Sequence, residues 1–61
     1  MTRGEKMRKA RGERTQKTVA NAVGISRSAL EMYENDKRSP KDAVKVSIAA
    51  YYGMTVQELF F

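Results

Sequence analysis

The side chains in this sequence that could do chemistry are mainly cationic. Twelve Lys and Arg residues stand against seven Asp and Glu, and the chain contains no His and no Cys. Without histidine there is no proton shuttle near neutral pH, and without cysteine there is no thiolate nucleophile or metal ligand. The four glycines stand singly, so there is no glycine-rich phosphate loop. This composition argues against an enzyme and against a metal or other cofactor, and it favours a protein that binds a polyanion.

The positive charge is concentrated in the first three-quarters of the chain. All Lys and Arg residues lie between Arg3 and Lys45, together with six acidic residues, which gives this stretch a net charge of +6. From Val46 to Phe61 there is no basic residue and only one acid, Glu58. This division predicts one surface that meets a polyanion and another that fills the core or meets a second protein. The alternative is that Lys and Arg only solvate helix faces.

The length and hydropathy of the chain limit the size of the core that it can bury. A chain of 61 residues, 41% of them hydrophobic, has room for one small core, so we expect a single domain over residues 1–61. No stretch approaches the ~20 apolar residues of a membrane span, and no signal peptide is recognisable. The expected location is the cytoplasm, with no membrane contact and no deep pocket for a small-molecule ligand.

Helix start and stop signals divide the chain into five short segments, and nothing alternates with the period of a strand. Thr2 and Thr55 each precede a glutamate by three residues, which is the spacing of a capping box. Pro40 and Asp42 suit the first turn of a helix that Ser39 would cap. Glycines at positions 12, 24 and 53 end three of the segments. The expected N-caps are Thr2, Thr15, Ser26, Ser39 and Thr55. The sequence therefore predicts an all-α fold.

Residues 16–35 carry the most specific pattern. Two helices of about eight residues are joined by Val23-Gly24-Ile25, and Ala20 is small where the helices must approach closely. The positions expected to face inward are Val19, Val23, Ile25, Leu30 and Tyr33. This spacing is typical of a helix-turn-helix, whose second helix lies in the DNA major groove. An ordinary helical hairpin is the alternative.

Short stretches over nearly the whole chain carry a resemblance to a known family. They are Met7–Arg11, Thr15–Ala20, Val23–Leu30, Tyr33–Arg38, Pro40, Ile48-Ala49, Tyr51–Gly53 and Val56–Phe60. In these stretches the sequence resembles the Cro and cI-type repressors, also called the XRE family of helix-turn-helix domains. The resemblance implies a compact five-helix, lambda-repressor-like fold that binds double-stranded DNA through its second and third helices. It also implies repression or other regulation of transcription, in a bacterium or phage.

The outward face of residues 26–35 is where the resemblance places base recognition. Leu30 and Tyr33 face inward, and the side chains that the resemblance implies at base edges are Arg27, Ser28 and Met32. Arg27 could donate two hydrogen bonds to guanine O6 and N7, and Met32 could pack on a thymine methyl group. Glu31 would accept from a cytosine amine, orient Arg27 or simply be solvated.

A second group of side chains is expected at DNA phosphates. The resemblance implies that Gln16 touches the backbone, which suits a side-chain amide beside the free N–H groups of a helix N-terminus. It also implies that the connector after the recognition helix runs along the DNA, so that its basic side chains join this group. The expected phosphate contacts are Gln16, Lys17, Ser26, Asn35, Lys37, Arg38 and Lys41. Each basic member could instead be a solvated side chain.

Four positions are expected to be structural or to depart from the family pattern. Because family members pair a first-helix arginine with a glutamate late in the recognition helix, Arg8 and Glu34 are expected to form a structural ion pair. Asp36 stands where glycine is common in a left-handed conformation, which Asp tolerates at some cost. Arg14 stands where an apolar residue is usual, which puts the geometry of that loop in doubt.

The apolar tail bears on oligomeric state. The expected dimer surface is Val56, Leu59, Phe60 and Phe61. Because two adjacent phenylalanines cannot both face inward from one helix, at least one of them should be exposed. A symmetric dimer would place two recognition helices about 34 Å apart on a palindromic operator. In the alternative, Phe61 folds back over its own chain.

Two functions of other classes stay open. A protein-interaction module, antitoxin-like or an anti-regulator, could share the fold, because function lies in the outward residues. Arg27, Ser28 and the flanking basic residues favour DNA over such a partner. A basic amphipathic peptide acting on membranes would need one long apolar stripe, and this chain is broken at positions 12, 24, 40 and 53.

Overall fold

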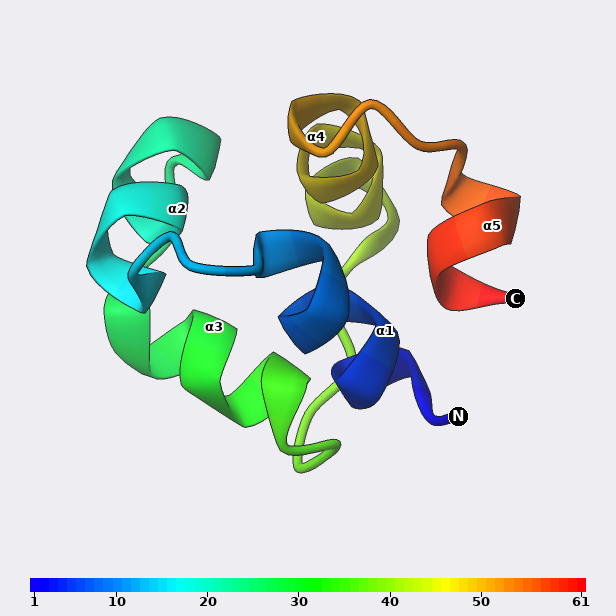
Figure 1. The fold of residues 1–61 in the computed structure, drawn as a ribbon, viewed down its shortest axis with the longest axis horizontal. Coiled ribbons are helices and arrows are strands. Elements are labelled where there is room, and N and C mark those ends of the chain that lie inside the picture. The colour runs from blue at the N-terminus through cyan, green and yellow to red at the C-terminus, as the bar shows by residue number, and fades with distance from the viewer.

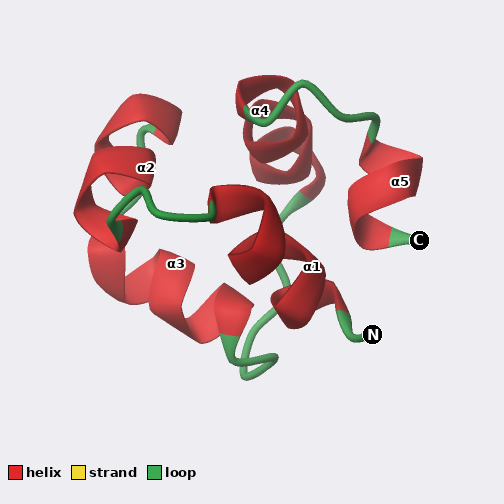
Figure 2. Ribbon diagram, in the orientation of Figure 1, coloured by secondary structure: helices red, strands yellow, loops and turns green.

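The structure, a computed structural model, describes residues 1–61 and contains five helices and no strand. The helices are α1 (Arg3–Arg11), α2 (Gln16–Val23), α3 (Arg27–Glu34), α4 (Asp42–Tyr51) and α5 (Val56–Phe60). The predicted all-α, five-helix fold is therefore confirmed. Short loops join the helices, and the longest of them connects α3 to α4 (Figure 2). None of the five is long and apolar enough to cross a bilayer.

The helices form a closed ring of contacts. In order around the ring, α1 packs on α3, α3 on α2, α2 on α4, α4 on α5, and α5 on α1 (Figure 1). The ends of the chain lie on the same side of the molecule, where α1 and α5 meet (Figure 1). Each helix therefore covers the core with two neighbours, which suits helices too short to be stable alone.

Most helix ends follow from local capping chemistry, as predicted. In both capping boxes, at Thr2 and at Thr55, the threonine hydroxyl accepts from the glutamate N–H at 3.1 and 3.0 Å. The glutamate carboxylate accepts in return from the threonine N–H at 2.9 Å in each box. Thr15 caps α2 and Ser26 caps α3 through their hydroxyls. These bonds satisfy N–H groups that the first turn leaves unpaired.

The start of α4 was predicted wrongly. Ser39 was expected to cap the helix, with Pro40 in its first turn. The helix instead begins at Asp42, after Lys41, whose backbone is extended and whose side chain makes no capping hydrogen bond. Pro40 is buried and lies outside the helix, two residues before it begins. The tertiary contact of the proline outweighs the local capping signal.

The core has two parts that meet between the helices. The larger cluster is Met7, Tyr33, Ile48, Ala49, Leu59 and Phe60, and the smaller cluster, between α2 and α3, is Val19, Ala20 and Leu30. Val23, Ile25 and Tyr52 pack against both clusters and join them. The predicted inward face of residues 16–35 is therefore confirmed, with Val23 and Ile25 at its partly buried edge.

The apolar tail divides between the core and the surface. Leu59 and Phe60 are fully buried, so their assignment to a dimer surface was wrong: this small chain uses both to complete its own core. Phe61 is 71% exposed, which confirms that one of the two phenylalanines faces outward. Two cations lie over its ring, with the Arg3 guanidinium 5.6 Å and the Lys45 ammonium 5.4 Å from its centre.

The start of α1 lies directly on the last turn of α3. The Gly4 N–H donates to the Asp36 carboxylate at 2.9 Å, and Asp36 has the positive φ of 59° that the sequence suggested. Hydrogen bonding to Thr2 and to the Gly4 N–H lowers the pKa of Asp36 below its ordinary value. A Cβ atom at Gly4 would stand 2.2 Å from the Glu34 carbonyl oxygen. Only glycine permits this close approach.

Gly4→Ala is therefore expected to destabilise the fold, although alanine usually stabilises a helix relative to glycine. The new methyl group meets backbone atoms, so α1 must move away from α3, at a cost of about 1–3 kcal/mol. Urea unfolding measures the loss. Lys9→Ala, at an exposed position of the same helix, should change stability by no more than about 0.5 kcal/mol. An unchanged or raised stability of Gly4→Ala would contradict the close approach.

Candidate nucleic-acid interface

The turn between α2 and α3 holds the two helices at a fixed angle. Gly24 ends α2 in a left-handed conformation with φ 85°, and the N–H groups of Gly24 and Ile25 both donate to the Ala20 carbonyl, at 2.9 and 3.0 Å. Only glycine adopts this backbone readily. Ala20 is almost fully buried beside Val19, where the helices approach. This turn directs one face of α3 toward solvent.

The outward face of α3 brings together all three side chains expected at base edges. They fall, with Glu31 and Asn35, within roughly 140° of the helix circumference. The Arg27 and Glu31 side chains are about half exposed, Ser28 is exposed, and Met32 is partly buried. Behind them Leu30 and Tyr33 hold the helix against the core.

Arg27 does not extend freely from this face. Its Nη1 donates to the Glu31 carboxylate at 2.9 Å and to the Gln16 side-chain oxygen at 3.1 Å. Glu31 thus orients Arg27, one of the roles left open for it. The Gln16 amide nitrogen in turn donates to the Glu34 carboxylate at 2.9 Å, and Glu34 is only 1% exposed. The sequence predicted none of the bonds made by Gln16.

The expected ion pair between Arg8 and Glu34 is replaced by one from Arg11. The Arg11 guanidinium donates to both oxygens of the Glu34 carboxylate, from Nε at 2.8 Å and from Nη2 at 3.1 Å. Arg8 donates to the Glu34 backbone carbonyl at 2.8 Å. The two arginines lie about one turn apart on α1, so both reach α3, but Arg11 is the one beside the carboxylate. These bonds raise the pKa of Arg11 above its ordinary value.

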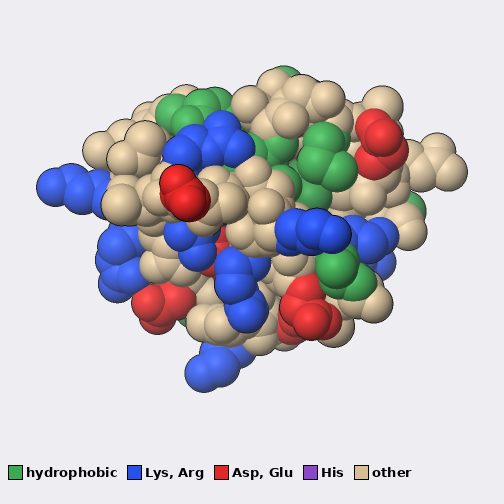
Figure 3. Space-filling model, in the orientation of Figure 1, with side chains coloured by type: hydrophobic (Ala, Val, Ile, Leu, Met, Phe, Trp, Pro, Cys, Tyr) green, Lys and Arg blue, Asp and Glu red, His purple; other side chains and the backbone are tan.

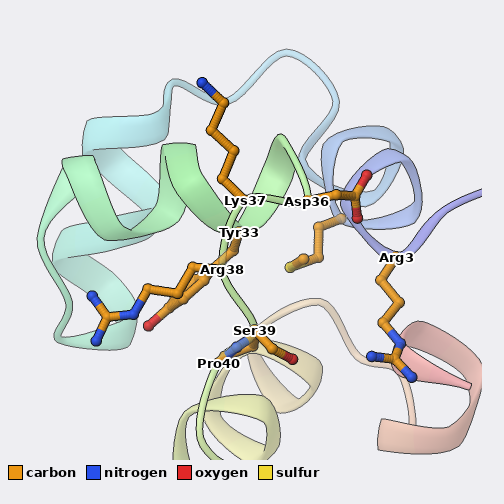
Figure 4. Close-up of a pocket in the computed structure, with 8 residues that line it drawn as sticks. Arg3, Tyr33, Asp36, Lys37, Arg38, Ser39 and Pro40 are labelled. Atoms are coloured by element: carbon orange, nitrogen blue, oxygen red, sulfur yellow. The ribbon is translucent and has the colours of Figure 1, made fainter.

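The residues expected at phosphates have different surroundings. Lys17 and Lys41 are exposed and their side chains make no hydrogen bond within the protein, whereas the Ser26 hydroxyl already caps α3. Lys37 and Arg38 extend from the connector in different directions (Figure 4). The connector walls a shallow pocket of about 230 Å³, lined by Arg3, Met7, Tyr33, Asp36, Lys37, Arg38, Ser39 and Pro40. Asn35 is exposed at the end of α3.

Basic side chains cover much of the molecule around these elements. Figure 3 shows Lys and Arg over α1, α2 and α3, with acidic side chains between them. The surface is therefore positive overall, but acidic side chains lie among the basic ones, so the local charge differs from place to place.

One cation has a role that the sequence did not indicate. The Arg14 guanidinium lies over the rings of Tyr51 and Tyr52, 5.2 and 5.1 Å from their centres. It also donates to the carbonyls of Ala10 and Arg11 at 2.8 and 3.1 Å. Arg14 therefore covers the aromatic side chains where an apolar residue was expected. Burial raises the pKa of Tyr52 to about 12.

Comparison with known families agrees with this geometry. The model of a family described as Helix-turn-helix matches residues 5–59, which include all of α2, α3 and α4 and most of α1 and α5. No curated protein matches the chain.

The two arginines that reach α3 should differ sharply when removed. Arg11→Met leaves the Glu34 carboxylate buried with one remaining partner, which costs about 3–5 kcal/mol. Arg8→Met removes a single hydrogen bond to a carbonyl at an exposed position and costs about 1 kcal/mol. Urea unfolding of both variants measures the difference. Arg11→Lys keeps the positive charge but cannot donate two parallel hydrogen bonds to the carboxylate, so its loss of stability should fall between those of the two methionine variants. A larger loss for Arg8→Met would overturn the assignment.

Proposed function

Because this chain belongs to the Helix-turn-helix family of Cro and cI-type (XRE) DNA-binding domains, we propose that it is a sequence-specific regulator of transcription that reads the major groove with α3. The observation that carries the proposal is the outward face of α3. This face combines an arginine, a hydroxyl and a thioether on a helix that the core holds rigidly from behind. Such groups suit the mixed donors, acceptors and methyl groups of base edges.

Each predicted contact has a chemical role in the proposal. Arg27 donates to guanine, Met32 packs on a thymine methyl group, and Ser28 serves as donor or acceptor. The proposed phosphate contacts are Gln16, Lys17, Ser26, Asn35, Lys37, Arg38 and Lys41. Occupying an operator blocks other proteins from the same groove, so repression is the simplest consequence of binding. As the resemblance to Cro and cI-type repressors implies, the proposed location is the cytoplasm of a bacterium, with the protein on the nucleoid when it binds DNA.

Selection from a randomised duplex DNA pool at two salt concentrations tests this function. The wild-type chain should enrich one motif. Arg27→Ala should relax the preference at one base pair, at a cost of about 1–3 kcal/mol on the preferred sequence. Lys17→Ala should weaken binding to all sequences alike and lower the salt slope by about one. Salt-sensitive binding with no enriched motif would refute sequence-specific regulation and favour a protein partner for α3.

We also propose that two copies bind the DNA together, with Phe61 and the partly exposed Val56 at their contact. The Cα atoms of one copy span 24 × 23 × 21 Å, less than the ~34 Å between successive major-groove half-sites. A single copy therefore cannot occupy both halves of a palindrome. The largely exposed Phe61 ring supplies an apolar group that a second copy could cover.

Phe61→Ser should therefore leave binding to one half-site unchanged but reduce the gain from a second half-site. Burying a phenylalanine is worth about 1.5–3 kcal/mol, so the loss should be about tenfold or more. Fluorescence anisotropy on duplexes with one and two half-sites measures it. Ala50→Ser, at an exposed position of α4, is the matched control. Equal loss on both duplexes would place Phe61 outside the contact between copies.

A further inference from the structure

A continuous chain of hydrogen bonds runs from the interior of the protein to the proposed base-reading side chain. It joins Arg11, Glu34, Gln16, Arg27 and Glu31 and is called the Glu34 relay below. Within it the Glu34 carboxylate is almost fully buried, whereas the Arg27 side chain is half exposed. The Glu34 relay therefore connects the interior, where side chains are most constrained, to the surface that would meet DNA.

The buried carboxylate decides which way the Gln16 amide faces. A carboxylate only accepts hydrogen bonds, so Gln16 must turn its NH₂ group toward Glu34. Its oxygen is then left for the Arg27 guanidinium, which only donates. The reversed amide would set oxygen against oxygen at one end and donor against donor at the other. Glu34 on one side and Arg27 on the other therefore fix a single orientation of the Gln16 amide.

The relay also occupies one nitrogen of Arg27. Both bonds that Arg27 makes within the protein leave from Nη1, which carries two hydrogens. No group of the protein accepts from Nη2 or Nε. An exposed ion pair with Glu31 alone would hold the side chain weakly. Gln16 adds a second anchor whose own position is set in the interior.

We propose that Glu34 and Gln16 are positioning residues, which make Arg27 read guanine through its Nη2 and Nε while Nη1 stays on Gln16 and Glu31. The inference rests on the proposed function, because it assigns the edge of Arg27 used for recognition. It also gives Gln16 a role in sequence preference, which a contact to phosphate would not. Phosphate contacts change affinity for every sequence alike.

Gln16→Met tests the relay with little change in side-chain length. Glu34 keeps both bonds from Arg11 in this variant, so the fold should survive, as a thermal melt would verify. The readout is the ratio of dissociation constants for the preferred duplex and for one changed at the Arg27 base pair. This ratio should fall about five- to tenfold, since freeing an arginine removes part of the discrimination of a bidentate contact.

Matched variants and the wild-type chain separate the possible results. Lys17→Met, at the next position of α2, should lower affinity on both duplexes and leave the ratio unchanged. If Gln16→Met behaves in the same way, Gln16 is only a phosphate contact and the proposal is wrong. Absence of any preferred duplex for the wild-type chain would instead refute the proposed function, before the variant is compared.

A measurement on the free wild-type protein tests the relay without DNA or mutation. In ¹⁵N-resolved NMR spectra at low temperature, the Nη1 protons of Arg27 should exchange with water at least about tenfold more slowly than those of Nη2, because only Nη1 is bonded. Equal exchange at the two nitrogens would overturn the proposal, even if Gln16→Met fails to fold.

Discussion

The rest of the structure depends on how one buried negative charge is satisfied. Removing a carboxylate from water costs several kcal/mol, so the Glu34 side chain requires partners wherever it is buried. Arg11 from α1 and Gln16 from α2 supply them, and Arg8 adds a bond to the Glu34 carbonyl. Gly4 permits α1 to approach the same turn. The two helices before α3 are therefore both registered against its last turn, and α3 cannot rotate without leaving the charge unpaired.

The hydrophobic core and this charge have different roles. Burial of Phe60, Leu59 and Ile48 supplies the free energy that holds a ring of short helices together. A buried ion pair contributes little net stability, because its desolvation cost offsets most of its attraction. The buried ion pair does, however, raise the free energy of every arrangement in which the partners of Glu34 are displaced. In this protein the apolar side chains stabilise the fold, and the Glu34 carboxylate selects one position of α3 within it.

The same distinction explains what the sequence could and could not predict. Capping boxes and glycine stops act within a few residues, so the ends of α1, α2 and α5 followed from local chemistry. The start of α4 did not, because the burial of Pro40 is a tertiary contact. Whether Arg11 or Arg8 pairs with the Glu34 carboxylate, and whether Phe60 or Phe61 enters the core, depends on contacts with other helices. The bonds of Gln16 likewise could not be predicted, since its partners lie 11 and 18 residues away.

In the proposed DNA complex, fixing the Arg27 side chain before DNA arrives has an energetic consequence for a domain this small. A free arginine carries about 2 kcal/mol of side-chain conformational entropy, which it would lose on docking to a base. In the Glu34 relay, Arg27 loses part of that freedom on folding, where the core supplies the free energy. Binding then requires less ordering, and a wrong base meets a guanidinium that cannot turn readily to find another acceptor. Under the proposal, the buried charge that positions α3 also limits, through Gln16, how Arg27 can respond to a mismatched sequence.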